Sequence, residues 1–165
     1  MKANYRIGGM IVPVLVATVM MAAPVQAHHS FAMYDTRITE VFTGIVTEVD
    51  PAPNHLTIFF APMNQERTNV ERDADGKPIS WSVEMGGSAL MARQGITVSN
   101  FPRGTIFSVG LHPLRSGKNG GSREGGLFRC PPKTPPEPGM HCDSVNGNVH
   151  SGKEPLAKPM NTHKE

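Results

Sequence analysis

The sequence predicts an all-β protein: a small five-stranded OB-like barrel with one short helix between the third and fourth strands, or, as the alternative, a small β-sandwich. Three observations predict this class. Residues 39–130 contain five short apolar runs rich in β-branched and aromatic residues, separated by turn-forming residues. β-Branched residues recur at every second position in the first run, and apolar and polar residues alternate in the third, which is the period of a half-buried strand. The segment between the third and fourth runs has a helical pattern instead.

The first two strands are predicted on either side of a turn. Residues 40–50 place β-branched side chains at every second position, which puts these side chains on one face of a strand. They are Val41, Thr43, Ile45, Thr47 and Val49. Residues 55–61 are predicted as the second strand, because the Asp-Pro-Ala-Pro-Asn sequence before them is typical of a turn. A charged stretch without an apolar face follows at residues 62–78.

The third predicted strand, residues 79–85, carries the only tryptophan of the chain. Ile79, Trp81, Val83 and Met85 alternate with polar residues, so we expect Trp81 to lie in the core. Glu84 then lies on the opposite face of this strand, where we expect a solvated carboxylate rather than a general acid.

The helix and the last two strands follow. Two glycines precede Ser88, which is predicted as the N-cap of a short helix, and Gly95 is predicted to end that helix. The fourth strand is predicted over residues 102–113, after a Pro-Arg-Gly turn. The fifth is predicted over residues 125–130, after a glycine-rich segment that has the composition of a loop.

Composition divides the chain into four segments. Residues 1–27 contain two basic residues, an apolar run broken by Pro13 and a Val-Gln-Ala sequence, which together predict a signal peptide cleaved after Ala27. Residues 28–38 are predicted as an N-terminal arm and residues 39–130 as the barrel domain. Residues 131–165 are rich in Pro and Gly, so we expect a disulfide loop and then an irregular tail. The sequence therefore predicts a periplasmic or secreted protein without a membrane span after processing.

The charge of the processed chain excludes one class of partner. The chain has 16 Lys and Arg residues, and removal of Lys2 and Arg6 with the signal peptide leaves 14, equal to the 14 Asp and Glu residues. These charges are dispersed, and the sequence has no basic stripe of the kind that neutralises phosphates in a nucleic acid. We therefore expect that the protein does not bind nucleic acid.

The two cysteines predict a disulfide rather than a reactive site. Cys130 and Cys142 are separated by eleven residues, and export would place them in an oxidising compartment. A metal site would need two further ligands, and His141 supplies only one of them. With both thiols in a bridge, the sequence offers no cysteine nucleophile, no glycine-rich phosphate loop and no serine nucleophile elbow. We therefore expect a non-catalytic protein without a cofactor.

The paired histidines after the signal peptide support a second hypothesis. If His28 becomes the first residue, its α-amino group and its ring can chelate one metal ion, and nitrogen-rich ligand sets favour Cu(II). His112, at the end of the fourth predicted strand, and His55, at the start of the second, are the candidates for a further nitrogen ligand. The alternative interpretation is that His28 and His29 are polar residues tolerated at the processing site.

Four segments together resemble the DUF6152 family of small exported bacterial proteins. They are the His-His-Ser-Phe sequence after the signal peptide, residues 81–95 (WSVEMGGSALMARQG), residues 110–117 (GLHPLRSG) and residues 130–142 (CPPKTPPEPGMHC). Family members usually have an aromatic residue before an Asn-Pro-His turn after the first strand. This chain has Asp-Pro-Ala-Pro-Asn-His there, and His55 matches the family histidine displaced by one residue. The resemblance implies a small exported β-protein and no particular reaction.

Two functions follow from the sequence. The first is an exported, non-catalytic binding or accessory module that holds a protein or small-molecule ligand on the surface and loops of the barrel. The second is a periplasmic copper(II)-binding protein that uses the mature N-terminal histidines.

Overall fold

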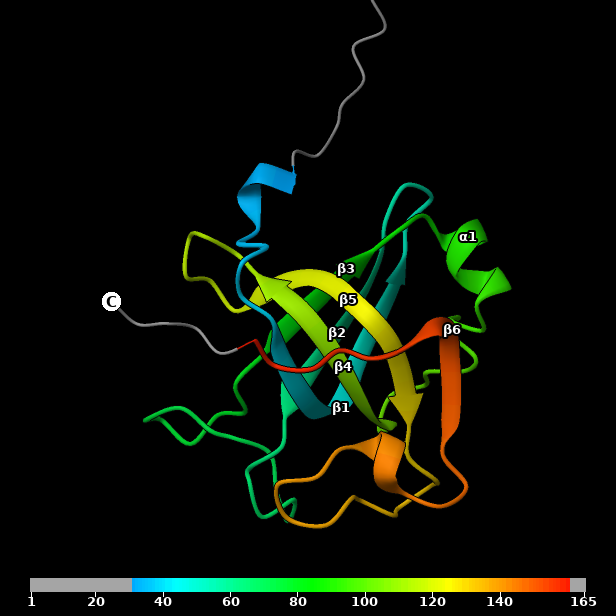
Figure 1. The fold of residues 1–165 in the computed structure, drawn as a ribbon. Helices are drawn as coiled ribbons and strands as arrows, with labels where there is room; N and C mark the ends of the chain where they lie inside the picture. Colours follow the sequence, from blue (N-terminus) through cyan, green and yellow to red (C-terminus); the bar gives the residue numbers. More distant parts are fainter. Residues whose placement is uncertain (1–30, 161–165) are drawn as a thin grey trace, which may run out of the picture.

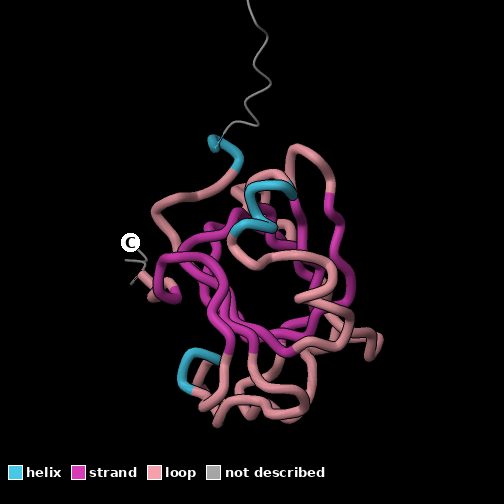
Figure 2. Tube along the Cα trace, turned by 90° about the vertical axis from the view of Figure 1, so that its right-hand side faces the viewer, coloured by secondary structure: helices cyan, strands magenta, loops and turns pink. Residues whose placement is uncertain are grey.

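The computed structural model describes residues 31–160 and shows a closed β-barrel (Figures 1 and 2). In chain order the elements are the 3-10 helix η1 (Phe31–Met33), β1 (Glu40–Pro51), β2 (Leu56–Pro62), β3 (Trp81–Met85), α1 (Ser88–Arg93), β4 (Ile106–Pro113), β5 (Gly120–Arg129), the 3-10 helix η2 (Cys142–Ser144) and β6 (Val149–Leu156). The all-β class and the position of α1 between the third and fourth strands are confirmed. Within the described part of the chain, every helix is too short or too polar to cross a membrane.

The pairing of the strands closes the barrel and favours it over the sandwich. β1 pairs antiparallel with β2 and β4, β2 pairs with β3, and β4 pairs with β5. A parallel pairing of β3 with β5 completes the ring, which satisfies the backbone groups at what would otherwise be two sheet edges. The same edge of β5 is shared: residues 120–122 pair with β3, and residues 125–129 pair with β6.

Strand β1 does not have the single apolar face that its sequence predicts. Phe42 and Val46 pack against the core, whereas Thr43 is buried on the other side of the strand, where it contacts the disulfide loop. A register shift between Val46 and Glu48 then changes the phase, so that Val49 packs against the core. The prediction is wrong before the bulge, because β-branched residues occur on both faces and the apolar Phe42 and Val46 face the core; it holds at Val49 only because the bulge adds one residue.

The core is built from apolar side chains of all five barrel strands, α1 and the loop that follows it. It contains Val46, Leu56, Ile58, Phe60, Val83, Met85, Met91, Ile96, Phe101, Phe107, Val109, Leu111 and Leu127. The Phe107 ring meets Phe60 and Phe101 edge-on, at centroid distances of 5.4 and 6.0 Å. Trp81 has the predicted core-facing phase but lies at the rim of the core, half-buried against Phe42.

Helix α1 begins differently from the prediction and ends as predicted. Gly87 is the N-cap and has no side chain to cap the helix, so the assignment of Ser88 as the N-cap is wrong. The Ser88 hydroxyl instead donates a hydrogen bond to the carbonyl oxygen of Ala52 at 2.7 Å, which ties the helix to the β1–β2 turn. Gly95 has a φ of +78°, a left-handed conformation that glycine adopts without strain and that ends the helix.

Strand β5 begins at Gly120 rather than at residue 125. Its first residues come from the glycine-rich segment that the sequence predicts as a loop. A Cβ atom on Gly121 would lie only 2.3 Å from the carbonyl oxygen of His112 on β4, so this position requires glycine for a close approach between strands. Glycine marks tight packing here and not a turn.

The C-terminal segment is more ordered than predicted. The Cys130–Cys142 disulfide is confirmed, with the sulfur atoms bonded. Beyond it, β6 pairs with β5, so the expectation of an irregular tail is wrong for residues 149–156. The His150 ring stacks on Phe128 with a centroid distance of 4.3 Å, and Leu156 is buried. Composition is a poor guide here because backbone hydrogen bonds and two or three side-chain contacts hold the strand.

Candidate functional site: a pocket between the arm, β3 and β5

The N-terminal arm is hydrogen bonded to the barrel and places Tyr34 on the outer surface of the barrel. Tyr34 forms a β-bridge with Leu114, and its carbonyl oxygen accepts a hydrogen bond from Arg115 Nε at 3.1 Å. His112 Nδ1 lies 2.7 Å from the carbonyl oxygen of Ile38 and donates to it, because a carbonyl can only accept. These contacts fix the arm over β4 and place Tyr34 beside β5.

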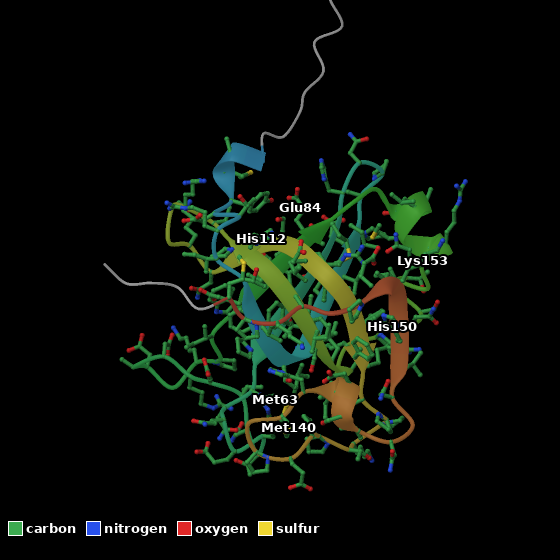
Figure 3. All side chains as sticks on the ribbon, in the orientation of Figure 1. Met63, Glu84, His112, Met140, His150 and Lys153 are labelled. Atoms are coloured by element: carbon green, nitrogen blue, oxygen red, sulfur yellow. A yellow bond between two sulfur atoms is a disulfide. The ribbon has the colours of Figure 1, made fainter. Side chains whose placement is uncertain are left out.

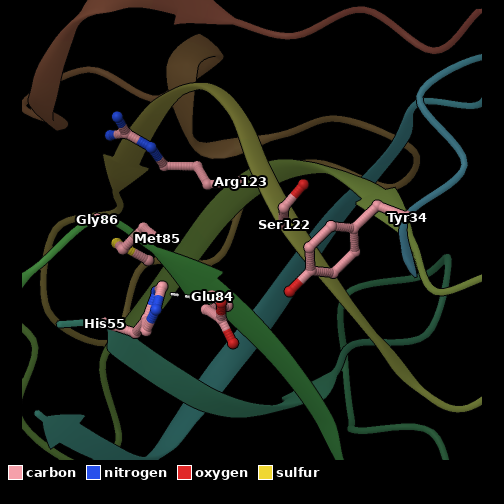
Figure 4. A pocket seen from close by; sticks show the side chains of 7 residues that line it. All are labelled: Tyr34, His55, Glu84, Met85, Gly86, Ser122 and Arg123. Atoms are coloured by element: carbon pink, nitrogen blue, oxygen red, sulfur yellow. Dashed lines mark ion pairs between the residues drawn. The ribbon is translucent and has the colours of Figure 1, made fainter. Parts of the chain in front are cut away.

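A pocket of about 330 Å³ lies between the arm, β3 and β5 (Figure 4). Seven residues line it: Tyr34, His55, Glu84, Met85, Gly86, Ser122 and Arg123. The β3–β5 pairing places Glu84 directly opposite Ser122, so these two side chains share the outer face of the barrel. The pocket therefore combines residues from three regions that the parallel closure of the barrel brings together.

Glu84 is the central polar group at one end of the pocket. His55 Nδ1 lies 3.2 Å from Glu84 Oε1, and each of these two side chains is about one-third exposed. The Tyr34 side chain reaches toward the same carboxylate (Figure 4). Glu84 faces outward as predicted, but the expectation of a freely solvated carboxylate is wrong because His55 pairs with it.

The pKa of the Tyr34 hydroxyl lies well above its usual value. Burial, together with the charge of Glu84 and the hydrogen bond to it, raises the pKa of Tyr34 to about 12. At neutral pH this hydroxyl is therefore protonated and cannot act as a base. Figure 4 shows the Tyr34 ring reaching toward Glu84 across the strand that carries Ser122.

Two buried polar atoms of the lining residues have no partner, and they belong to opposite faces of β5: Ser122 shares the face of Glu84, whereas the Arg123 side chain points away from it (Figure 4). Arg123 Nη1 and Ser122 Oγ are both buried and form no hydrogen bond to any residue in the described part of the chain. Burial lowers the pKa of Arg123, and the nearby charges of Glu154 and Glu124 oppose this shift. Buried polar groups normally have partners, and an unmade bond costs about 1–3 kcal/mol. A ligand that supplies acceptors would remove that cost.

A second His–Glu pair lies on the same face of the barrel. His112 Nε2 is 3.3 Å from Glu124 Oε2, and the His112 side chain is only 14% exposed. Sheet register places Glu84, Ser122 and His112 on the neighbouring strands β3, β5 and β4, and adjacent strands are about 4.8 Å apart. Figure 3 shows Glu84 and His112 near the same end of the barrel.

The predicted metal ligands are not assembled into one site within the described residues. His55 and His112 each pair with a different glutamate, and no cluster of three or more His, Cys, Asp and Glu side chains that could hold a metal ion occurs between residues 31 and 160. His28 and His29 lie outside the described residues.

At the opposite end of β5, buried hydroxyl groups hold the disulfide loop. Thr43 Oγ1 lies 2.7 Å from Ser108 Oγ and 2.8 Å from His141 Nδ1. The Cys142 N–H donates to Ser108 Oγ at 2.8 Å. Burial and the charge of Arg67 lower the pKa of His141, which favours the neutral ring inside this network.

Sequence reasoning found only part of the pocket. Tyr34, Ser122 and Arg123 were not candidates, and Glu84 was considered and set aside. Tyr34 is the only tyrosine that follows the predicted signal peptide, which is a usable signal. Ser122 and Arg123 carry no such signal, because only the register of β5 reveals their position beside Glu84.

Comparison with known proteins connects the pocket to a family. The model of DUF6152, a family of unknown function, matches residues 15–123. The matched range contains all seven lining residues of the pocket and ends before the disulfide loop, so that loop is not part of the match although its sequence contributed to the resemblance. No curated protein and no solved structure matches the chain. The chain therefore belongs to the DUF6152 family.

Proposed function

We propose that the protein is an exported, non-catalytic binding module whose pocket takes a small zwitterionic molecule. The positive group of the ligand is placed at Glu84, and its carboxylate at Arg123. One observation carries this proposal: the pocket is lined by the Glu84 carboxylate, which pairs with His55, and by Arg123, whose Nη1 has no partner in the described chain.

The acidic end is prepared for a positive group. His55 pairs with the Glu84 carboxylate and Tyr34 lies beside it, which orients the carboxylate before a ligand arrives. A carboxylate has about four lone-pair positions, and two neighbours leave acceptor capacity for an ammonium group. A preorganised acceptor loses less side-chain entropy on binding than a mobile one.

The opposite end is prepared for a carboxylate. Arg123 presents N–H donors in a planar fork that matches two carboxylate oxygens. The apolar part of the ligand would contact Met85, whose side chain lines the pocket between the two ends. The volume of about 330 Å³ fits a molecule of the size of an amino acid.

The chemistry of the side chains in the pocket fits ligand binding better than catalysis. A general base should have a pKa near the working pH, and the pKa of Tyr34, raised to about 12, is far above neutrality. Both cysteines are in the disulfide, so neither is a nucleophile. Export is supported by the signal-peptide features of residues 1–27 and by this disulfide, which is typical of proteins in oxidising compartments.

A matched set of four-carbon ligands tests the proposal. Backbone NMR spectra of the processed protein are recorded during titration with γ-aminobutyrate, butylamine and butyrate at constant ionic strength. We expect γ-aminobutyrate to bind at least about tenfold more tightly than either singly charged ligand, with shifts centred on Gly86 and Ser122. Alanine, as a shorter zwitterion, tests the distance between the two ends.

Variants assign the two ends of the ligand. Glu84→Gln should remove the advantage of γ-aminobutyrate over butyrate, and Arg123→Gln should remove its advantage over butylamine. Glu48→Gln, which removes an exposed carboxylate from β1, is the charge-matched control and should change nothing. Equal binding of all the ligands, or none by either zwitterion, would contradict the proposal.

Copper binding is the second candidate, and the fastened arm supports it. His28 precedes Phe31, the first residue of η1, by three positions in the sequence, and the arm that follows η1 is attached to the barrel at Tyr34. His112 donates its Nδ1 proton to a backbone carbonyl and turns Nε2 toward Glu124, which is how proteins commonly orient a metal-binding histidine. His112 is therefore favoured over His55 as the third nitrogen ligand.

Copper titration of a chain that starts at His28 tests this candidate. One additional N-terminal residue, or the substitution His28→Ala, should abolish tight Cu(II) binding, because the chelate needs both the amine and the ring of the first residue. His112→Ala should weaken binding more than His55→Ala. Unchanged affinity in the chain with the additional residue would exclude the N-terminal site.

A further inference from the structure

A basic groove lies at the end of the barrel opposite the pocket. It has a volume of about 430 Å³ and is bordered by the turn before β4, the end of β5 and the disulfide loop. Arg103, Arg129 and Lys133 contribute to its lining, one from each of these segments, and no acidic residue does. Because the processed chain has equal numbers of acids and bases, this grouping is a local excess of positive charge.

Arg129 is held in place at the base of the groove. Its Nη1 donates to the carbonyl oxygen of Asn100, and its guanidinium lies over the Phe101 ring at 5.4 Å from the centroid. Its Nε is buried and has no hydrogen-bond partner among the described residues. The side chain is therefore fixed before any ligand binds.

Lys133 is held by the loop that carries it. Its φ of +58° is left-handed, a conformation that costs a non-glycine residue about 1 kcal/mol. The turn around it is closed by a hydrogen bond from Thr134 N–H to the carbonyl oxygen of Pro131 at 3.1 Å. Cys130, three residues before Lys133, is anchored by the disulfide and by its own N–H, which donates to the carbonyl oxygen of Ile106. The loop thus directs a cation toward the groove at some conformational cost.

None of the three cations is neutralised by a carboxylate within the described chain. The ion pairs found between residues 31 and 160 involve Arg37, Arg115, His55 and His112. Like charges close together in one concave surface repel each other, and a bound multiply charged anion replaces this repulsion with attraction. Arginine forks match the oxygens of a phosphate group in particular.

We infer that this groove is a second binding site, independent of the proposed zwitterion pocket, and that it takes a phosphate group. A phosphate dianion would contact the exposed cations Arg103 and Lys133 at the rim, with the fixed guanidinium of Arg129 behind them. The phosphate group can belong to a soluble phosphate ester or to a lipid headgroup, and the two sources share this chemistry.

Titration with inorganic pyrophosphate tests the site in the processed protein. The variant Arg103→Gln/Lys133→Gln removes the two exposed cations and leaves the structural Arg129 in place, and Arg93→Gln/Lys118→Gln is the control with the same charge change elsewhere on the surface. We expect the first variant to lose at least about tenfold in affinity and the control to retain it. Affinity should also fall as salt is raised.

Co-sedimentation with vesicles separates the two sources of phosphate. Binding to vesicles of phosphatidylglycerol and phosphatidylcholine, absent with phosphatidylcholine alone and lost in Arg103→Gln/Lys133→Gln, would identify a lipid headgroup. Pyrophosphate binding without vesicle binding would identify a soluble phosphate. Failure to bind pyrophosphate, or equal loss in both double variants, would overturn the site. Neither result depends on whether γ-aminobutyrate binds at Glu84.

Discussion

The two ends of β5 are covered by short segments that are fastened in different ways. The arm covers the first end through hydrogen bonds and a bridge at Tyr34, and its neighbours there are titratable and partly exposed. The disulfide loop covers the second end through a covalent bond and the buried hydroxyl network of Thr43 and Ser108. The difference indicates that stability depends more on the loop end, whereas the arm end holds the groups that respond to pH and ligands.

Removing the disulfide should have the largest effect on the stability of the protein. Cys130→Ser/Cys142→Ser should lower the free energy of unfolding by about 2–4 kcal/mol, because the bridge restricts the unfolded chain. The stiff prolines in the loop favour the lower half of this range. Urea denaturation of the double variant and the parent measures the effect. A loss comparable to that of Tyr34→Phe would remove the contrast between the two ends.

Removing the hydroxyl of Thr43 should be the next largest change at the loop end. Thr43→Val leaves His141 Nδ1 and Ser108 Oγ each without one partner in a buried position, which should cost about 1–3 kcal/mol. Thr57→Val, on the adjacent strand β2, is the matched control and should stay within about 0.5 kcal/mol. Equal losses in the two variants would show that the network contributes nothing.

At the arm end, Tyr34→Phe should have a smaller effect on stability. The ring stays in place and only the hydroxyl that faces Glu84 is lost, so we expect a loss of at most about 1 kcal/mol at neutral pH in urea denaturation. If Tyr34→Phe lowers the free energy of unfolding more than Thr43→Val does, the arm contributes more to stability than the disulfide loop.

The titration of Tyr34 sharpens the comparison without unfolding the protein. In a chain that starts at His28, Tyr34 is the only tyrosine, so absorbance at 295 nm reports its ionisation alone. We expect a pKa of about 12 in the parent and a lower value in Glu84→Gln, which removes the neighbouring charge but leaves burial, the largest cause of the shift, in place. An unchanged pKa in the variant would attribute the whole shift to burial.

The same pKa predicts how stability responds to alkali. The folded state holds the Tyr34 proton more tightly than the unfolded state, so this contribution to stability is complete below pH 10 and is lost as the pH rises to about 12. Tyr34→Phe should lack this part of the alkaline loss. Denaturation midpoints at pH 9 and pH 11 measure the difference.

The sequence predicts the parts of the fold that depend on side-chain pattern. The alternation of Val83 and Met85, the left-handed Gly95 and the cysteine spacing predict β3, the end of α1 and the disulfide. It does not predict features that depend on backbone pairing. The bulge in β1, the start of β5 at Gly120 and the whole of β6 depend on hydrogen bonds between distant segments.

The candidate site is less predictable than the fold for the same reason. Glu84 is placed on the outer face by its sequence phase, but its partners come from the arm and from the β1–β2 turn. Ser122 reaches it only through the parallel closure of the barrel. A local pattern can therefore locate one carboxylate of this pocket and cannot assemble the pocket.

Strand β6 also affects how copies of the protein meet in a crowded compartment. It is the last strand in the sheet order, and its outer edge is where another chain could add a strand. That edge carries Gly152 with a φ of +94°, the charged pair Lys153 and Glu154, and Pro155, which has no N–H to donate. The bend, the charges and the missing donor make β6 a poor template for intermolecular sheet growth, so this edge protects the protein against aggregation.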